Sequence, residues 1–342
     1  MPPVVKVFAR GHPKLQSERH DLKRKPTDLR RLRTEQSNAA ATDLDQKSSL
    51  QIASLINAED ATVALVVRRA LPQIARAIDQ VAAALRHGGR LIYVGAGTSG
   101  RIAALDAAEI PPTFNTKPDA VQFVIAGGEK ALASETEASE DDTQLARKEM
   151  SKRKPTKHDV VLGIASSGRT PFTVAATEYA RHHGAKTIAL TCNRNSPLER
   201  AAHFAIVTEV GPEVLAGSSR MKAGTAHKMV LNMISTAAMT RLGYVYGNLM
   251  VNVVPKNEKL KQRAIGILER ATGADHEAAT QTLRASANRT PVALVMLAAG
   301  VSRPQATAAL KKSQGHVRKA ITSAKSMWGQ PPRLSRRAQR DA

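Results

Sequence analysis

Five short apolar runs alternate with amphipathic segments through the middle of this 342-residue chain. The runs lie at 90–94, 121–125, 159–164, 186–191 and 203–207. Helices are expected between most of them, at 99–109, 135–152 and 171–183. Strands that alternate with helices predict a parallel sheet covered by helices on both faces. Ligands bind at the carboxyl ends of such strands, so the loops that follow Val94, Ile125 and Ile164 are the candidate site.

Helices are also predicted on either side of this sheet. Before it, apolar residues recur at helical spacing over 74–85, between Pro72 and a glycine pair. After it, an alanine- and methionine-rich helix is expected over 223–242. Beyond Gly273 the pattern changes to three short helices, predicted at 275–287, 291–299 and 304–312. Three helices in so few residues indicate a small compact bundle.

The net charge of +22 is concentrated at the two ends of the chain. Residues 1–33 carry +7 and residues 311–342 carry +8, which leaves +7 for the long central region. Both ends are rich in proline and polar residues, so mostly disordered, solvated tails are expected. The alternative is a non-specific hold on nucleic acid or an anionic surface. No specific nucleic-acid partner is predicted.

Cys192 is the only cysteine, which excludes an intramolecular disulfide and a cysteine metal cluster. It lies in an apolar run and is expected to be a small buried side chain. The spacing of the histidines does not predict a metal site. No apolar run reaches the roughly 20 residues that span a bilayer, and the N-terminus lacks the apolar core of a signal peptide. A cytoplasmic protein without a membrane segment is therefore expected.

The first candidate loop, 95–101, reads Gly-Ala-Gly-Thr-Ser-Gly-Arg between a predicted strand and a predicted helix. Its glycines match the dinucleotide pattern G-x-G-x-x-G, but the next strand ends without the acidic residue that would hold a ribose. The hydroxyls of Thr98 and Ser99 lie beside a helix N-terminus, where backbone N–H groups and the helix dipole favour a phosphate. A purely structural glycine turn is the alternative.

The loop after the third predicted strand has the same character. It lies between a strand and a helix, and it combines the hydroxyl residues Ser166, Ser167 and Thr170 with Gly168. One such loop could act only as a helix cap. Two on the same sheet edge are better explained by one shared anion, so the sequence predicts a phosphate site between them.

Together with their strands, these two loops resemble the phosphosugar-binding domains of the sugar isomerase (SIS) family. The resemblance narrows because further motifs occur in the order seen in the N-acetylmuramic acid 6-phosphate etherases. These motifs are Asp106-Ala-Ala-Glu109-Ile-Pro-Pro-Thr113, Ile125-Ala-Gly-Gly-Glu129, 167–171, 211–225, 246–251 and 257–260. The match covers roughly 34–320. The long segment 211–225 is also shared with the animal glucokinase regulatory proteins, so the glutamates must decide on enzyme activity.

The resemblance implies a domain organisation. An SIS-type three-layer α/β sandwich, with a parallel sheet flanked by helices, would occupy 34–270. A small three-helix bundle similar to ubiquitin-associated (UBA) domains would follow at 271–321. The basic tails would then be 1–33 and 322–342. The family also implies a homodimer whose active sites use residues from both subunits.

The implied activity is cleavage of the D-lactyl ether of N-acetylmuramic acid 6-phosphate, in the recovery of cell-wall amino sugar. The products would be N-acetylglucosamine 6-phosphate and D-lactate. Opening of the sugar ring makes the C2 proton acidic, so a base can remove it while an acid protonates the departing lactyl oxygen; water then adds at C3. Two carboxyls of different protonation suit these roles. No metal and no organic cofactor is required.

By the resemblance, Glu109 matches the proton donor and Glu140 the general base. Apolar neighbours of Glu109, such as Leu105 and Ile110, would favour its protonated form. Glu140 lies among several acids near a predicted helix start, and these could simply complement the helix dipole. Glu137, three positions earlier, is the alternative base.

Ser218, Ser219, Arg220 and Lys222 precede the long helix in the 211–225 motif. They could bind the lactyl carboxylate or another anion, since arginine offers a bidentate fork. A subunit contact organised by Arg220 has equal weight.

Two rival functions are considered. An aldose–ketose isomerase on the same fold would also remove a C2 proton; the Glu109 and Glu140 pair and the 211–225 motif speak against it. A non-catalytic phosphosugar sensor, like the glucokinase regulatory protein, is the second. That regulator carries two copies of the SIS pattern, whereas this chain has one.

Overall fold

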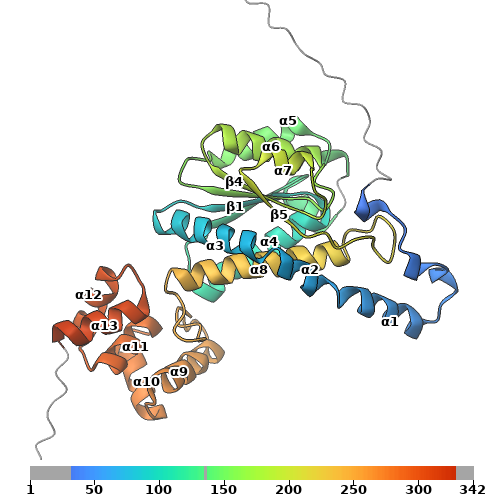
Figure 1. Cartoon of the computed structure of the whole chain (residues 1–342). Helices are drawn as coiled ribbons and strands as arrows, with labels where there is room; N and C mark the ends of the chain where they lie inside the picture. The colour runs from blue at the N-terminus through green and yellow to red at the C-terminus, as the bar shows by residue number, and fades with distance from the viewer. Residues whose placement is uncertain (1–31, 135–136, 329–342) are drawn as a thin grey trace, which may run out of the picture.

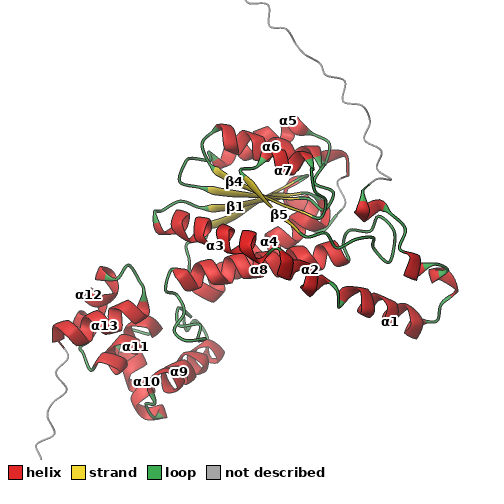
Figure 2. Ribbon diagram, in the orientation of Figure 1, coloured by secondary structure: helices red, strands yellow, loops and turns green. Residues whose placement is uncertain are grey.

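The computed structural model describes residues 32–134 and 137–328. At its centre lies a parallel five-stranded sheet in the order β2-β1-β3-β4-β5 (Figure 2). The strands are β1 (Leu91–Gly95), β2 (Val121–Ile125), β3 (Val160–Ile164), β4 (Lys186–Thr191) and β5 (Phe204–Val207). The five strands predicted from apolar runs are confirmed.

Helices cover both faces of the sheet, which makes a three-layer sandwich (Figure 1). One face carries α5 (Thr143–Arg153), α6 (Pro171–His182) and α7 (Pro197–Ala201); the other carries α3 (Leu71–Arg86), α4 (Gly97–Phe114) and α8 (Lys222–Arg241). Alternation along β1 supplies both cores. Leu91 and Tyr93 pack with α3, α4 and α8, whereas Ile92 and Val94 pack with α5 and α6. The predicted fold class is confirmed.

Helix α4 is longer than the sequence predicts. It continues past Pro111 and Pro112 to Phe114, whereas a stop near residue 109 is expected. Two prolines remove two backbone N–H donors from the helix. The hydroxyl of Thr113 donates to the Glu109 carbonyl oxygen at 2.7 Å, which adds a side-chain hydrogen bond to the last turn.

Helix α5 is shorter than predicted. It begins at Thr143 rather than near 135, because the Asp142 carboxylate accepts a hydrogen bond from the Leu145 N–H at 2.8 Å and caps the helix. Glu140 therefore lies in the turn before the helix and not on it.

The C-terminal part of the chain folds around its own hydrophobic core (Figure 1). It contains α9 (Glu258–Thr272), α10 (His276–Ala285), α11 (Thr290–Ala299), α12 (Arg303–Lys312) and α13 (Val317–Trp328). The three predicted helices correspond to α10, α11 and α12, and α9 and α13 join them through Ile265, Leu268 and Ile321. This core includes Val251, so the boundary expected at residue 271 divides one packed unit.

An arm of short 3₁₀ turns precedes α1 (Ser49–Asp60) and α2 (Val63–Arg69). No residue of α1 is buried, and Figure 1 shows this helix projecting from the sandwich. The stretch Ser49–Arg69, with a mean hydropathy of 1.4, is long and apolar enough for a membrane span and is 11% buried. The expectation that no run reaches this length is therefore wrong. A single such helix is weak evidence for a membrane, and an exposed apolar face also suits contact with another protein.

The predicted basic tails fall mostly outside the described residues. At their inner edges the structure differs from the prediction, because Leu32 is buried and residues 322–328 continue α13.

Candidate active site

The strand order reverses between β1 and β3. In open α/β sheets ligands bind at such a reversal, outside the carboxyl ends of the strands. Gly95 is paired with Ile164 at the ends of these two strands, so the loops that follow them start side by side. These are loops 95–101 and 165–171, which the sequence predicts to bind phosphate.

The first loop turns sharply into α4. Gly97 has a φ of +50°, in the left-handed region that favours glycine. Ala96 is the N-cap and supplies no side-chain hydrogen bond, so the N–H groups of the first turn have no capping side chain. At this helix end Ser99 is 7% exposed and Thr98 is half-buried. Backbone donors, a helix dipole and two hydroxyls thus lie together, as the phosphate prediction requires.

The second loop is built in the same way at the start of α6. Ser166 is buried, and the half-buried Ser167 accepts the N–H two residues on at 3.2 Å. Thr170 is the N-cap residue, but its hydroxyl makes no cap hydrogen bond. Gly168 has a φ of +66°, and a Cβ there would lie 2.4 Å from the Ser196 side chain, so the turn requires glycine.

Glu140 lies between the two loops. Its carbonyl oxygen accepts the N–H of Phe172, in the first turn of α6, at 2.9 Å. Its Oε1 atom is 3.0 Å from the point that a Cβ on Gly97 would occupy. The structure therefore brings the predicted base to the predicted phosphate loops.

The 211–225 motif leads into α8 beside the first loop. A Cβ on Gly224 would lie 3.5 Å from the Thr98 methyl group and 3.7 Å from the Ser219 carbonyl oxygen. Glu213 is fully buried and accepts the N–H groups of the first two α8 residues at 2.9 and 3.0 Å. These contacts hold the start of α8 against the first loop.

The polar residues of this motif differ in their surroundings. Ser218 and Ser219 are half-buried and Arg220 is exposed. The Lys222 side chain is 4% exposed and forms an ion pair with Glu59 of α1. The hydrogen bond from Lys222 holds the pKa of Glu59 below its usual range. Lys222 therefore joins the arm to the sandwich.

Glu109 lies far from the two loops within this chain. It follows Gly97 by twelve residues on α4, which is about 18 Å along the helix axis. Its side chain is 61% exposed and lies 3.3 Å from Nζ of Lys228 on α8. Of the apolar neighbours predicted for Glu109, Leu105 is exposed, whereas Ile110 is buried and lines a hollow together with Glu109. One copy of the chain does not bring Glu109 and Glu140 together.

The helix that carries Glu109 is fixed by a buried polar cluster one turn earlier. Asp106 is 3% exposed and accepts hydrogen bonds from the Tyr93 hydroxyl at 2.8 Å and the Ser235 hydroxyl at 3.1 Å. Burial raises the pKa of Asp106, although both hydrogen bonds oppose this. Because the cluster joins β1, α4 and α8, Glu109 is presented from a rigid surface.

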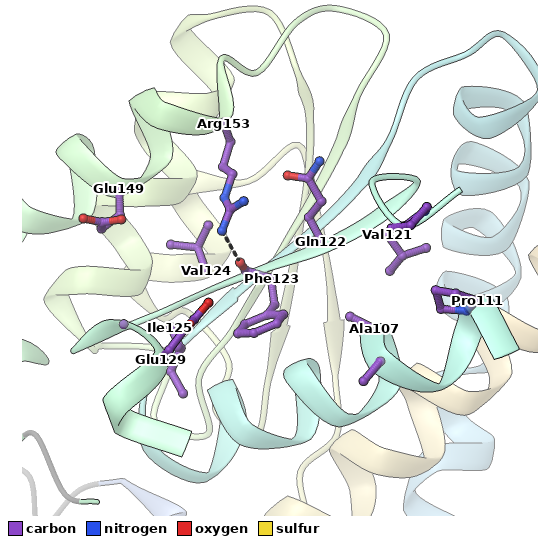
Figure 3. Close-up of a pocket in the computed structure, with 13 residues that line it drawn as sticks. Ala107, Pro111, Val121, Gln122, Phe123, Val124, Ile125, Glu129, Glu149 and Arg153 are labelled. Atoms are coloured by element: carbon purple, nitrogen blue, oxygen red, sulfur yellow. Dashed lines mark hydrogen bonds between the residues drawn. The ribbon is translucent and has the colours of Figure 1, made fainter. Parts of the chain in front are cut away.

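Two hollows flank α4. One, of about 460 Å³, has Asp106 and Glu109 in its wall, together with residues of α8 and of the segment 245–250. The other, of about 480 Å³, runs along the free edge of β2 between α4 and α5. There Arg153 donates to the Phe123 carbonyl oxygen at 3.2 Å (Figure 3). Neither of these two hollows is lined by the predicted phosphate residues.

Sequence reasoning missed three side chains that support the loops. His227 on α8 contacts Ser99, and Asn193 donates to the carbonyl oxygen of Ser166 at 2.9 Å and to the Thr34 hydroxyl at 3.2 Å. Glu59 is the third, through its pair with Lys222. A polar residue on an otherwise apolar helix face, as at His227, is the signal that could have been noticed. Within the described residues, no group of three or more His, Cys, Asp or Glu side chains could hold a metal ion.

Two family comparisons agree with this architecture. Residues 73–181 match the glucokinase regulatory protein N-terminal SIS domain, and residues 143–237 match the SIS domain. A phosphoheptose isomerase from Francisella tularensis is among the similar solved structures, with 19% identity and a TM-score of 0.46 over 57% of this chain and 100% of that one. The matches to the two SIS models, together with the parallel five-stranded sheet, define an SIS-domain protein.

Curated relatives narrow the class. N-acetylmuramic acid 6-phosphate etherase 1 from Bacillus licheniformis is 47% identical over 291 residues, which is 85% of this chain and 96% of the relative. The N-acetylmuramic acid 6-phosphate etherase of Streptomyces coelicolor is 47% identical over 313 residues, 92% of this chain and 97% of the relative. The chain belongs to the N-acetylmuramic acid 6-phosphate etherase family.

Proposed function

We propose that this protein cleaves the D-lactyl ether of N-acetylmuramic acid 6-phosphate to N-acetylglucosamine 6-phosphate and D-lactate. The observation that carries the proposal is the position of Glu140, a family-matched base, against Gly97 at the switch point of the sheet. Such a protein is a carbon–oxygen lyase. A cytoplasmic location suits it, because its substrate is a charged sugar phosphate.

The phosphate is held by the two loops in this proposal. Backbone N–H groups at the starts of α4 and α6 and the hydroxyls of both loops surround it; those hydroxyls belong to Thr98, Ser99, Ser166, Ser167 and Thr170, with Gly168 shaping the second turn. Helix N-termini favour an anion without a counter-ion. Ser218, Ser219 and Arg220 precede α8, whose Gly224 lies beside Thr98 of the first loop, and they bind the lactyl carboxylate or another anionic group.

The reaction then proceeds by elimination and hydration. In the open-chain sugar the Glu140 carboxylate removes the C2 proton, which the C1 aldehyde makes acidic. The electron pair forms the C2–C3 double bond, the bond between C3 and the lactyl oxygen breaks, and Glu109 donates a proton to that oxygen. Glu140 then releases its proton to solvent, takes a proton from the water that adds at C3 and delivers it to C2, while Glu109 regains a proton from solvent. The acid and the base each contribute through their positions and opposite protonation states.

The separation of the two glutamates supports a homodimer. Glu140 contacts Gly97, and Glu109 lies about 18 Å farther along α4. That separation is too large for a base and an acid that act on neighbouring carbons of one sugar. Glu109 of the partner subunit would complete the site beside Glu140. The exposed apolar arm supplies a surface for this assembly, because Leu50 is 77% and Leu65 is 59% exposed.

D-lactate release from N-acetylmuramic acid 6-phosphate tests the activity. Wild type should release lactate, and Glu109→Gln and Glu140→Gln should each fall by about a hundredfold or more. Glu137→Gln serves as the matched control and should stay near wild type. A folded wild type that binds the phosphosugar without releasing lactate would favour the non-catalytic sensor, and formation of a ketose product would favour the isomerase.

Co-expression of the two inactive variants tests the shared site. Mixed dimers of Glu109→Gln with Glu140→Gln contain one intact site, so random pairing should restore about one quarter of wild-type activity. Each variant alone should remain inactive. If the mixture stays as inactive as its components while mixed dimers form, both glutamates act within one subunit.

A further inference from the structure

A chain of buried polar side chains runs from the first loop into the core. Nδ1 of His227 lies 3.4 Å from Oγ of Ser99, and Nε2 of the same ring lies 3.8 Å from Sγ of Cys192. That sulfur is 3.5 Å from Oγ1 of Thr208. Ser99 is 7% exposed and the other three side chains are fully buried. The imidazole therefore connects the first loop to the residues that follow β4 and β5.

Burial sets the protonation states of this chain. It lowers the pKa of His227 to about 4. It raises the pKa of the Cys192 thiol to about 12, although the hydrogen bond with Thr208 opposes this. At neutral pH the imidazole thus carries a single N–H, and the thiol keeps its proton.

The single imidazole N–H can occupy either nitrogen, with opposite consequences for Ser99. If Nε2 carries it, the ring donates to the sulfur and the Ser99 hydroxyl donates to Nδ1, so its oxygen lone pairs face the loop. If Nδ1 carries it, Ser99 accepts from the ring and its own hydrogen is free. Only the second arrangement lets Ser99 donate to a phosphate oxygen.

We propose that His227 is a positioning residue whose Nδ1–H donates to Ser99 Oγ and so directs the Ser99 hydroxyl hydrogen toward the substrate phosphate. The inference rests on the proposed function, because it requires phosphate at the first loop. The Cys192 thiol stabilises the same tautomer by donating to Nε2. Protons along the chain then point from the core toward the bound anion.

The location of His227 supports this role. It lies in the first two turns of α8, three residues after Gly224, which packs against Thr98 of the same loop. One helix thus contacts both hydroxyl residues of the first loop. Burial keeps the imidazole neutral, and no charged partner within residues 32–134 and 137–328 opposes it, so the ring acts as a hydrogen-bond donor and not as a counter-charge for the phosphate.

Binding of N-acetylglucosamine 6-phosphate, measured by calorimetry, tests the inference without turnover. Ser99→Ala and His227→Leu should each weaken binding by about tenfold, the effect of one hydrogen bond to a charged group. The variant that carries both changes should bind as well as the single variant of lower affinity, because both changes remove the same hydrogen bond to the phosphate. His227→Asn, whose amide nitrogen can replace Nδ1 as donor, should recover most of the affinity. In turnover, His227→Leu should raise KM far more than it lowers kcat.

The tautomer itself gives a second test that needs no substitution. In the nitrogen NMR spectrum of the ligand-bound wild type, the proton of His227 should be on Nδ1. A proton on Nε2 would overturn the inference, as would wild-type affinity in a folded His227→Leu or losses that multiply in the double variant. If the affinities follow the expected pattern but no lactate is released, the inference stands while the proposed reaction fails. If Ser99→Ala binds as wild type does, the phosphate loop is misassigned and the inference fails with it.

Discussion

The Glu140 carboxylate packs against Gly97, with Oε1 3.0 Å from the point that a Cβ on Gly97 would occupy. Gly97 also has a φ of +50°. A side chain at this position would therefore meet both backbone strain and the predicted base.

We expect Gly97→Ala to lower lactate release by about tenfold or more, because a small displacement of a catalytic group is costly. Its backbone strain should cost roughly 1 kcal/mol of stability. Gly88→Ala is the matched control, since Gly88 has a φ of +79° and a Cβ there would have no neighbour within 4 Å. Thermal unfolding and activity assays of both variants separate the effects. Equal activity losses in the two would show that the contact with Glu140 is unimportant.

Removing one partner of the Glu59–Lys222 ion pair should destabilise the fold more than replacing both. Lys222 is almost fully buried, so Glu59→Gln removes the carboxylate that its ammonium group contacts and should cost about 3 kcal/mol in the free energy of unfolding. Adding Lys222→Met to this variant should recover part of the loss. Urea unfolding measures both. A double variant less stable than Glu59→Gln would contradict this account.

Asp159 should make stability depend on pH in the acid range. Burial raises the pKa of this carboxyl, but hydrogen bonds from Arg90 and Thr156 outweigh it and hold the pKa below the usual 3.8. A lowered folded-state pKa gives stability that is complete above the unfolded pKa and lost as pH falls through the folded value.

Asp159→Asn should therefore cost about 2 kcal/mol in the free energy of unfolding at pH 7. The difference from wild type should narrow below about pH 4, as the carboxyl of the unfolded chain and then, at lower pH, that of the native protein becomes protonated. Urea unfolding at several pH values checks this, with the exposed Asp45→Asn as control. A difference that is constant down to pH 3 would exclude the charged pair as its cause.

Cys192 should be unreactive in the folded protein. It is fully buried, and burial raises the pKa of its thiol to about 12, so almost no thiolate is present at pH 8. A thiol reagent should label one group per chain in urea and label the native protein only as fast as the protein opens. Rapid labelling without denaturant would show that the site around His227 is more open than described.

The strands and the two loops at their carboxyl ends could be predicted because their signals are local. A five-residue apolar run bounded by turn residues indicates a buried strand, and glycine with hydroxyl residues indicates a turn at a helix start, where an anion is favoured. Helix ends were harder. Helix α4 continues through its two prolines, and the start of α5 is set by the Asp142 cap; hydrophobic periodicity reports neither. The domain boundary predicted at residue 271 is wrong, because α9 packs with the later helices and local patterns do not show which helices pack together.

The sequence by itself determined the sheet, its helices, the loops at its carboxyl edge and, through long motifs, the family. Only the tertiary structure decided which distant residues meet. Ser99 and His227 are 128 positions apart, and Glu59 and Lys222 are 163 apart. It also decided that Glu109 lies toward the C-terminal end of α4 while Glu140, only 31 positions later in the sequence, contacts the N-terminal end of that helix. Sequence patterns record the local preference of each segment, whereas such pairings arise from the packing of α1, α4 and α8, which burial of apolar surface drives without regard to sequence distance.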